Sequence, residues 1–273
     1  MLNGFDKLKG RYILLIFLIY IIFNGLIAHF FSFIGMDKIG DVSKFILDIT
    51  LVVLLFWILI RYRIKIRNLF GRIPVPTIWP KVFGLLILLG FFSVSVGVFQ
   101  EYLFPSIHPG SEEFYGLYNF SDPVSLIINN MSIVILVPLI EELIFRSVLI
   151  HRWSRKWSTR TAVILSAIIF GVGHLDPIGA FTFGIVASLL YIKTKSLWVP
   201  LAAHAFNNFI VSLIVIYVAT AYTPEASVAI TSTDLLISGI IILITLPPLI
   251  YFIRRNWPTK YEKLPYYMNR LED

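Results

Sequence analysis

Three short polar clusters interrupt long apolar stretches of this chain, and their side chains could do acid–base chemistry. Ionisable groups inside apolar segments are costly, so they are candidates for function. Carboxylates and imidazoles can act as general bases and acids, and imidazoles and amides can donate hydrogen bonds to a developing oxyanion. The clusters contain Glu141, Glu142 and Arg146, then Phe170 and His174, and then His204, Asn207 and Asn208.

The first cluster divides into a paired and an unpaired carboxylate if it is helical. Glu142 and Arg146 are four residues apart, so they share a helix face and can form an ion pair. Glu141 lies about 100° around the helix from Glu142 and cannot easily reach the same arginine. We therefore expect Glu141 to be the unpaired carboxylate, which suits a general base or acid. The competing interpretation is a buried ion network that only holds helices together.

The two histidine clusters also have structural interpretations. Two glycines precede His174 and would let another helix or a substrate approach closely. A lone histidine at a helix end is more often structural than catalytic. His204 and Asn208 are four residues apart and share a helix face. Their alternative role is hydrogen bonding between helices, which is common in membrane bundles.

The depth of the three clusters favours one shared site. Glu141 lies roughly 15 Å, and His174 roughly 20 Å, from the basic end of its helix at 1.5 Å per residue. His204 and Asn208 lie roughly 10 and 16 Å from the basic end of theirs. The helix of Glu141 is predicted to run opposite to the other two, yet all the polar groups reach one layer near the middle of the membrane. Scattered structural residues would not be expected to do this.

The apolar segments that carry these clusters are long enough to cross a bilayer, which takes about 20 residues of helix. The fifth and sixth segments are short and could form a hairpin packed inside the bundle. Other polar residues, including Asp48 and Gln100, are placed near the ends of spans, where hydration costs little. The predicted spans are Tyr12–Ile34, Phe45–Ile60, Val82–Phe104, Val124–Ile150, Thr161–His174, Ile178–Ile192, Trp198–Ala219 and Leu235–Ile253.

The basic residues alternate between connections and so predict the orientation. Lysine and arginine gather before the first span, in the second, fourth and sixth connections, and after the last span. Such an excess marks the cytoplasmic side. Both termini are therefore predicted to be cytoplasmic, with an even number of spans. The first apolar run has no convincing small-residue cleavage site, so we expect an uncleaved helix rather than a signal peptide.

The composition supports a membrane protein and excludes several other classes. Of the 273 residues, 58% are hydrophobic and 14% are charged, whereas a soluble domain has about 25% charged residues. The net charge of +7 is therefore attributed to membrane orientation and not to nucleic-acid binding. The absence of cysteine excludes disulfides, thiol catalysis and cysteine metal ligands. Residues 1–273 are predicted to form a single all-α domain, a polytopic transmembrane helix bundle of about eight spans.

Taken as a set, the clusters resemble the motifs of the CAAX protease and bacteriocin-processing family, also called the Abi family. The family includes type II CAAX prenyl endopeptidases and many bacterial membrane proteins. The resemblance covers the block 125–213, which would be the catalytic core. The matching motifs are EExxxR at Glu141, Glu142 and Arg146, FxxxH at Phe170 and His174, and HxxxN at His204 and Asn208.

The resemblance implies an intramembrane endopeptidase with a role for each residue. Glu141 and His174 would activate the attacking water. His204 and Asn208 would stabilise the oxyanion, and the motif spacing favours Asn208 over the adjacent Asn207. The residues that would support and orient the site are Glu142 and Arg146.

The dependence on a metal is left open by the sequence. No cofactor is expected, because the HExxH spacing of zinc proteases is absent. A zinc-dependent version of the protease is nevertheless an alternative, since carboxylates and imidazoles are zinc ligands. Its ligands would be Glu141, His174 and His204.

Two non-proteolytic functions compete with the protease. One is a bacteriocin-immunity factor or signalling scaffold of the same fold. The other is a transporter with a proton relay, which should show paired broken helices or internal symmetry, and the sequence shows neither. The expected partners are the lipid bilayer and a membrane protein or peptide substrate, with no nucleic acid. The composition suggests a bacterial plasma membrane.

Overall fold

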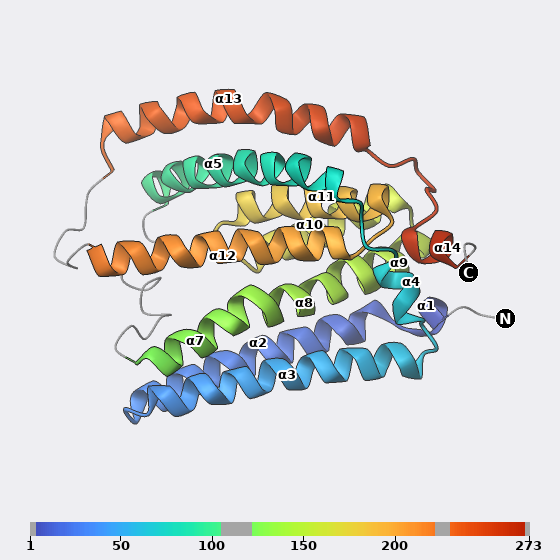
Figure 1. Cartoon of the computed structure of the whole chain (residues 1–273), viewed down its shortest axis with the longest axis horizontal. Coiled ribbons are helices and arrows are strands. Elements are labelled where there is room, and N and C mark those ends of the chain that lie inside the picture. Colours follow the sequence, from blue (N-terminus) through green and yellow to red (C-terminus); the bar gives the residue numbers. More distant parts are fainter. Residues whose placement is uncertain (1–3, 105–121, 222–229, 271–273) are drawn as a thin grey trace.

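The computed structural model describes residues 4–104, 122–221 and 230–270, and this part of the chain is helical without any strand (Figure 1). The predicted all-α membrane fold is therefore confirmed. The helices are α1 (Gly4–Lys7), α2 (Gly10–Phe33), α3 (Asp37–Arg61), α4 (Ile66–Phe70), η1 (Pro76–Ile78), α5 (Trp79–Leu103), α7 (Pro123–Met131), η2 (Ser132–Leu136), α8 (Val137–Glu141), η3 (Glu142–Leu149), α9 (Ile150–Lys156), α10 (Thr159–Val172), α11 (Pro177–Thr194), α12 (Trp198–Ala221), α13 (Ser232–Asn256) and α14 (Pro265–Asn269).

Each predicted span coincides with a helix or a helical run, although the number of crossings stays a prediction. Six of the described helices are long and apolar enough to cross a membrane: α2, α3, α5, α11, α12 and α13. Helix α10 is apolar but shorter, and the run from Pro123 to Lys156 is divided by two π-helical segments. The cytoplasmic location of the termini likewise stays a prediction, but the two ends of the chain lie at the same end of the bundle (Figure 1).

The placement of Asp48 near the end of a span was wrong. Helix α3 begins at Asp37 and not at Phe45, so Asp48 lies near its middle and is 2% exposed. Tyr20 and Asn24 of α2 donate to its Oδ1 at 2.7 and 3.2 Å, and the Ser132 hydroxyl donates to Oδ2. A buried carboxylate needs such partners. Asp48 therefore ties three helical segments together.

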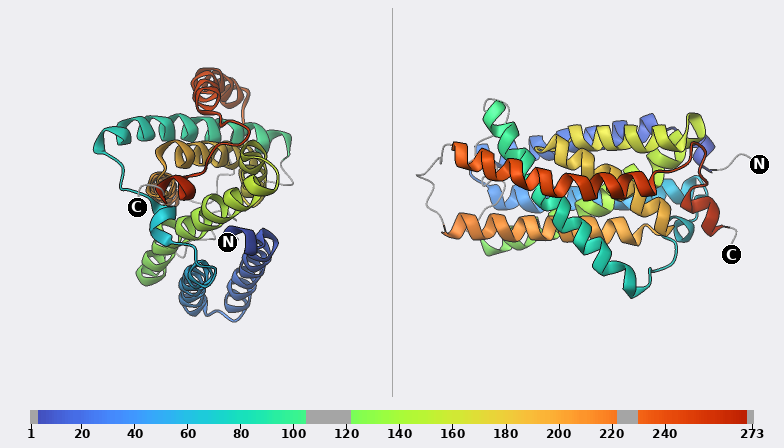
Figure 2. Two further views of the ribbon diagram at one scale, coloured as in Figure 1. Left: turned by 90° about the vertical axis from the view of Figure 1, so that its right-hand side faces the viewer. Right: turned by 90° about the horizontal axis from the view of Figure 1, so that it is seen from above.

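The helices form inner and outer layers of the bundle. Figure 2, seen from one end, shows α13 and α5 on one side, α2 and α3 on the other, and the remaining long helices between them. In an apolar 18-residue stretch of each helix, 6% of α2 and 17% of α13 is buried inside the bundle, whereas 61% of α11 is buried. The outer helices therefore present apolar side chains to lipid, and the polar clusters lie on inner helices.

The run from Pro123 to Lys156 is the central element of the bundle. Its start is capped by Asp122, whose carboxylate accepts from the amides of Val124 and Ser125. It then passes through the π-helical segments η2 and η3. π-Helical turns are rare in proteins, and those that occur are often found at functional sites. Every residue of η3 is buried, including its two charged residues, so this segment forms the polar centre of an otherwise apolar core.

Candidate active site

Glu142 is the hub of a buried cluster of charges. Its Oε1 lies 2.9 Å from an Arg146 guanidinium nitrogen, which confirms the predicted ion pair. The same Oε1 lies 3.0 Å from Nδ1 of His204, which α12 brings in from another part of the chain. Glu142 and Arg146 are both 0% exposed, and His204 is 3% exposed. Removing one partner from such a pair would leave an uncompensated charge, at a cost of about 3–5 kcal/mol.

Aromatic rings enclose the Arg146 guanidinium. Its carbon lies 4.5 Å from the centre of the Phe170 ring, 5.9 Å from Phe183 and 6.0 Å from Phe145. None of its guanidinium nitrogens makes a well-angled hydrogen bond within the described residues. The charge is therefore held by the Glu142 carboxylate and by the negative faces of the rings. Phe170, the first residue of the second motif, thus has a defined contact with the first motif.

Glu141 is oriented differently from Glu142 and faces two imidazoles. Its Oε2 lies 3.6 Å from Nε2 of His204 and 3.9 Å from Nε2 of His174. Both distances are too long for direct hydrogen bonds. Oε2 is buried and has no hydrogen-bond partner among the described residues. The predicted division into a paired Glu142 and an unpaired Glu141 therefore matches the geometry.

The orientation of His174 follows from the end of α10. Its Nδ1 lies 2.6 Å from the carbonyl oxygen of Phe170, so the Nδ1–H donates there and Nε2 carries a lone pair when the ring is neutral. Gly171 allows the close approach expected from the sequence, because a Cβ there would lie 2.7 Å from the Pro177 carbonyl oxygen. Gly173 has no such close neighbour and instead lines the cavity described below.

Asn208 lies one helical turn beyond His204 and binds main chain. Its Nδ2 donates to the carbonyl oxygen of Ile133, in η2, at 2.9 Å. In a π-helix this carbonyl would accept from the amide five residues on, and position 138 is a proline without an N–H. Asn208 therefore supplies a donor that Pro138 cannot. The structure brings Arg146, His174 and His204 to Glu141 and Glu142. It joins Asn208 to this group through the same central helix.

A small cavity of about 150 Å³ reaches Glu141 and His174. One wall consists of Phe17, Tyr20 and Ile21 of α2, which the sequence analysis did not select. No polar motif marks these positions, and only the packing of α2 against η3 brings them to the site. The Tyr20 hydroxyl is turned to Asp48, so it presents a mainly apolar ring to the cavity. The cavity can thus hold a small group beside a carboxylate and an imidazole.

The described residues contain no group of three or more histidine, aspartate or glutamate side chains that could hold a metal ion as they stand. The Nε2 atoms of both imidazoles nevertheless face Glu141 Oε2. The distances from Oε2 exceed the roughly 3.3 Å expected between two ligands with bonds of about 2.0 Å to a tetrahedral zinc. A zinc ion would therefore require these side chains to move closer together.

Comparison with known proteins gives a consistent result. Residues 123–210, which hold all three motifs, match the family described as type II CAAX prenyl endopeptidase Rce1-like. The chain is also 29% identical over 171 residues to the Bacillus subtilis (strain 168) protein named "Putative membrane peptidase YdiL", covering 62% of this chain and 67% of that protein. No solved structure matches. These findings confirm the resemblance drawn from the three motifs.

Proposed function

We propose that this protein, whose residues 123–210 match the Rce1-like CAAX protease family, is an intramembrane endopeptidase whose attacking water is activated by Glu141 and His174. The observation that carries the proposal is the facing pair of acceptors, Glu141 Oε2 and His174 Nε2, which are 3.9 Å apart beside a cavity. This separation is too long for a direct hydrogen bond, but one water oxygen could lie about 2.8 Å from both atoms.

The proposed reaction moves one proton through Glu141. The water gives a proton to the Glu141 carboxylate while its oxygen attacks the scissile carbonyl carbon, and His174 accepts the second hydrogen bond and orients the attack. The carbonyl π electrons move to oxygen and form an oxyanion. When the C–N bond breaks, Glu141 returns its proton to the leaving amine. Glu141 is suited to this exchange because its Oε2 has no hydrogen-bond partner among the residues that the structure describes.

In this proposal, His204 donates a hydrogen bond to the oxyanion. Its Nδ1 contacts Glu142, and its Nε2 points to the Glu141 side of the site. Two carboxylates and one guanidinium leave one negative charge, which an imidazolium at His204 would balance. Such an imidazolium would present an N–H at Nε2. Asn208 uses one amide hydrogen on Ile133 and has a second for the same oxyanion.

The proposed substrate is a membrane-associated protein or peptide. Glu141 lies in the apolar bundle, and the cavity beside it is walled largely by aromatic and aliphatic side chains. An extended segment entering from the bilayer or its surface could place one peptide bond there.

The experiment is cleavage of a mixed membrane-peptide library by the purified full chain in detergent. The wild type is compared with Glu141→Gln, and Glu101→Gln serves as the control because Glu101 is an exposed carboxylate at the end of α5. A second wild-type sample contains a zinc chelator. Cleavage that is lost only in Glu141→Gln supports the glutamate mechanism.

The other outcomes separate the alternatives. Cleavage that the chelator abolishes and added zinc restores would favour the metal version, with Glu141, His174 and His204 as ligands. A folded wild type that cuts no peptide, in cells that behave identically with Glu141→Gln, would favour the immunity or scaffold function. Retained cleavage by the Glu141→Gln protein would overturn the proposed role of Glu141.

A further inference from the structure

A second and larger cavity lies at the end of the bundle that carries both termini. Its volume is about 1040 Å³. Four separate segments build it: α1 with the start of α2, the end of α3, the turn that follows α3, and α14. Asn269 of α14 fixes this arrangement by donating to the carbonyl oxygens of Asn68 and Lys195, each at 2.9 Å. The backbone N–H of Lys65 also donates to the Tyr266 hydroxyl at 3.4 Å.

Among the described residues, those that line this cavity include five basic side chains and no acidic one. None of its cations makes an ion pair with any other residue that the structure describes. The nearby acidic residue of α1, Asp6, is instead paired with Arg155 at 2.6 Å. Arg63 has a left-handed backbone (φ 55°), which turns the chain sharply after α3. The cations of the rim are Lys7, Arg61, Arg63, Lys65 and Arg270.

The wall of the cavity is apolar and includes two interfacial aromatics. Ile13, Ile16 and Ile58 lie on the α2 and α3 faces that line it, and Tyr12 and Trp57 of the same two helices also line it. Trp57 is 59% exposed, and tyrosine and tryptophan are typical of the boundary between lipid chains and water. A ligand here would meet positive charge at the rim and apolar surface along the two membrane helices.

We propose that this cavity binds the phosphodiester headgroup of an anionic phospholipid, with its acyl chains against α2 and α3. Basic pockets between transmembrane helices on the side rich in lysine and arginine suit such headgroups. The unpaired cations supply the charge complement, and the continuous apolar wall favours a lipid over a soluble phosphate. This site is separate from the proposed protease site and does not depend on its chemistry.

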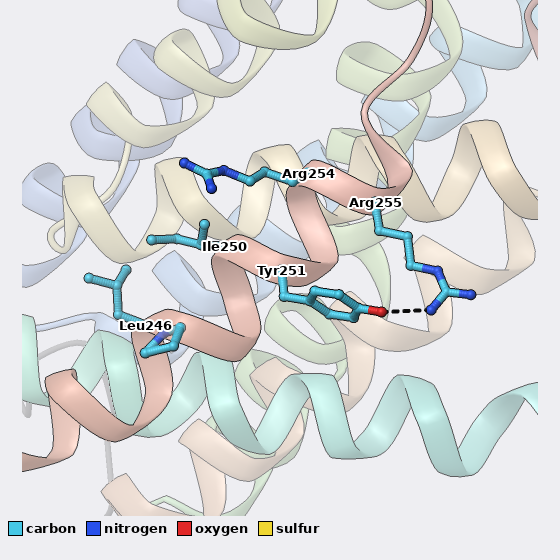
Figure 3. A pocket seen from close by; sticks show the side chains of 6 residues that line it. Leu246, Ile250, Tyr251, Arg254 and Arg255 are labelled. Atoms are coloured by element: carbon cyan, nitrogen blue, oxygen red, sulfur yellow. Dashed lines mark hydrogen bonds between the residues drawn. The ribbon is translucent and has the colours of Figure 1, made fainter.

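A pocket on α13 provides a natural contrast at the same end of the bundle. It has a volume of about 630 Å³ and is lined by a single helix face (Figure 3). Its two cations are Arg254 and Arg255, and Figure 3 shows Arg255 turned to the Tyr251 hydroxyl, to which it donates at 2.8 Å. This pocket therefore has two arginines, but no other helix encloses it among the described residues. Arg254 and Arg255 thus serve as controls for Arg61 and Arg63.

The test measures binding of a fluorescent phosphatidylglycerol to the purified full chain in non-ionic detergent, by anisotropy. The site variant is Arg61→Gln with Arg63→Gln, and the control variant is Arg254→Gln with Arg255→Gln. Competitors are phosphatidylcholine with the same chains, glycerol 3-phosphate and an acidic peptide. Thermal unfolding, followed by circular dichroism, checks that each variant is folded.

We expect the site variant to bind about thirtyfold more weakly, at roughly fivefold for each cation removed near an anionic lipid surface. The control variant should bind as the wild type does. Equal losses in the two variants, or no loss in a folded site variant, would overturn the proposal. Competition by phosphatidylcholine as strong as that by unlabelled phosphatidylglycerol would also overturn it. Effective competition by glycerol 3-phosphate or by the peptide would reassign the cavity to a soluble anion or to an acidic segment of a protein.

Discussion

The two charged regions of this molecule solve opposite problems. In the central site, Glu142, Arg146 and His204 are almost wholly buried, and Glu142 Oε1 lies within 3.0 Å of a nitrogen of each of the other two. At the end of the bundle, arginines such as Arg61 and Arg63 line an open cavity and make no ion pair with any residue in the described part of the chain. Charge inside a bilayer must be balanced largely by the protein itself, because bulk water is excluded from the apolar layer. Charge at the membrane surface can remain available to an external ligand.

The largest expected effect comes from Glu141, whose buried Oε2 has no hydrogen-bond partner among the described residues. Glu141→Gln keeps the size of the side chain but removes the proton acceptor, so we expect the rate of peptide cleavage to fall by about 10³-fold. Since Glu141 has no ion pair as close as that of Glu142, the free energy of unfolding should change little. Cleavage kinetics and unfolding in a denaturing detergent measure the two quantities. A large loss of stability would show that Glu141 is part of the structural network.

The next effect should appear in stability. Arg146→Met leaves the Glu142 carboxylate buried without its cation, so we expect a loss of about 3–5 kcal/mol in the free energy of unfolding. Adding Glu142→Gln to this variant removes the orphaned charge and should recover part of the loss. The same unfolding measurement tests both proteins. A double variant that is less stable than Arg146→Met alone would contradict the balance of charges described here.

A smaller effect is expected at Asn208. Asn208→Ala removes the donor to the Ile133 carbonyl and should lower the free energy of unfolding by about 1–3 kcal/mol. If Asn208 also stabilises the oxyanion, cleavage should fall by about 10²-fold without a matching change in KM. Asn207→Ala is the neighbouring control. Equal effects of the two substitutions would argue against a specific role for Asn208.

The smallest effect is expected at the basic rim. In detergent without anionic lipid, Arg61→Gln with Arg63→Gln should change the free energy of unfolding by less than about 0.5 kcal/mol, because exposed side chains without partners contribute little. Thermal and denaturant unfolding measure this change. A marked destabilisation would mean that these arginines are structural after all, and the contrast between the two regions would no longer hold.

Much of the site could be predicted from the sequence alone. Glu142 and Arg146 share a face at i,i+4 in any helix, so their pairing could be predicted locally. The positions of apolar runs located the long helices to within a few residues in most cases. The three motifs also indicated the family, because they occur in order on hydrophobic segments.

Other features depended on contacts between distant segments. Asp48 was misjudged because the helical start at Asp37 is polar and does not extend the apolar run that the sequence analysis followed. The wall formed by Phe17 and Tyr20 has no motif, since ordinary apolar residues acquire a role only through their neighbours. The partnership of Asn208 with Ile133 depends on a π-helical turn and on Pro138, which local spacing does not reveal.

The sequence alone thus determined an all-α membrane bundle, the residues with chemical potential and the ion pair within one helix. These follow from hydrophobicity and from the regular geometry of a helix. Only the tertiary structure decided that Glu141 faces two imidazoles, and that cations from four segments surround one cavity. Both results join residues that are far apart in the chain, and helix packing rather than local sequence sets such distances.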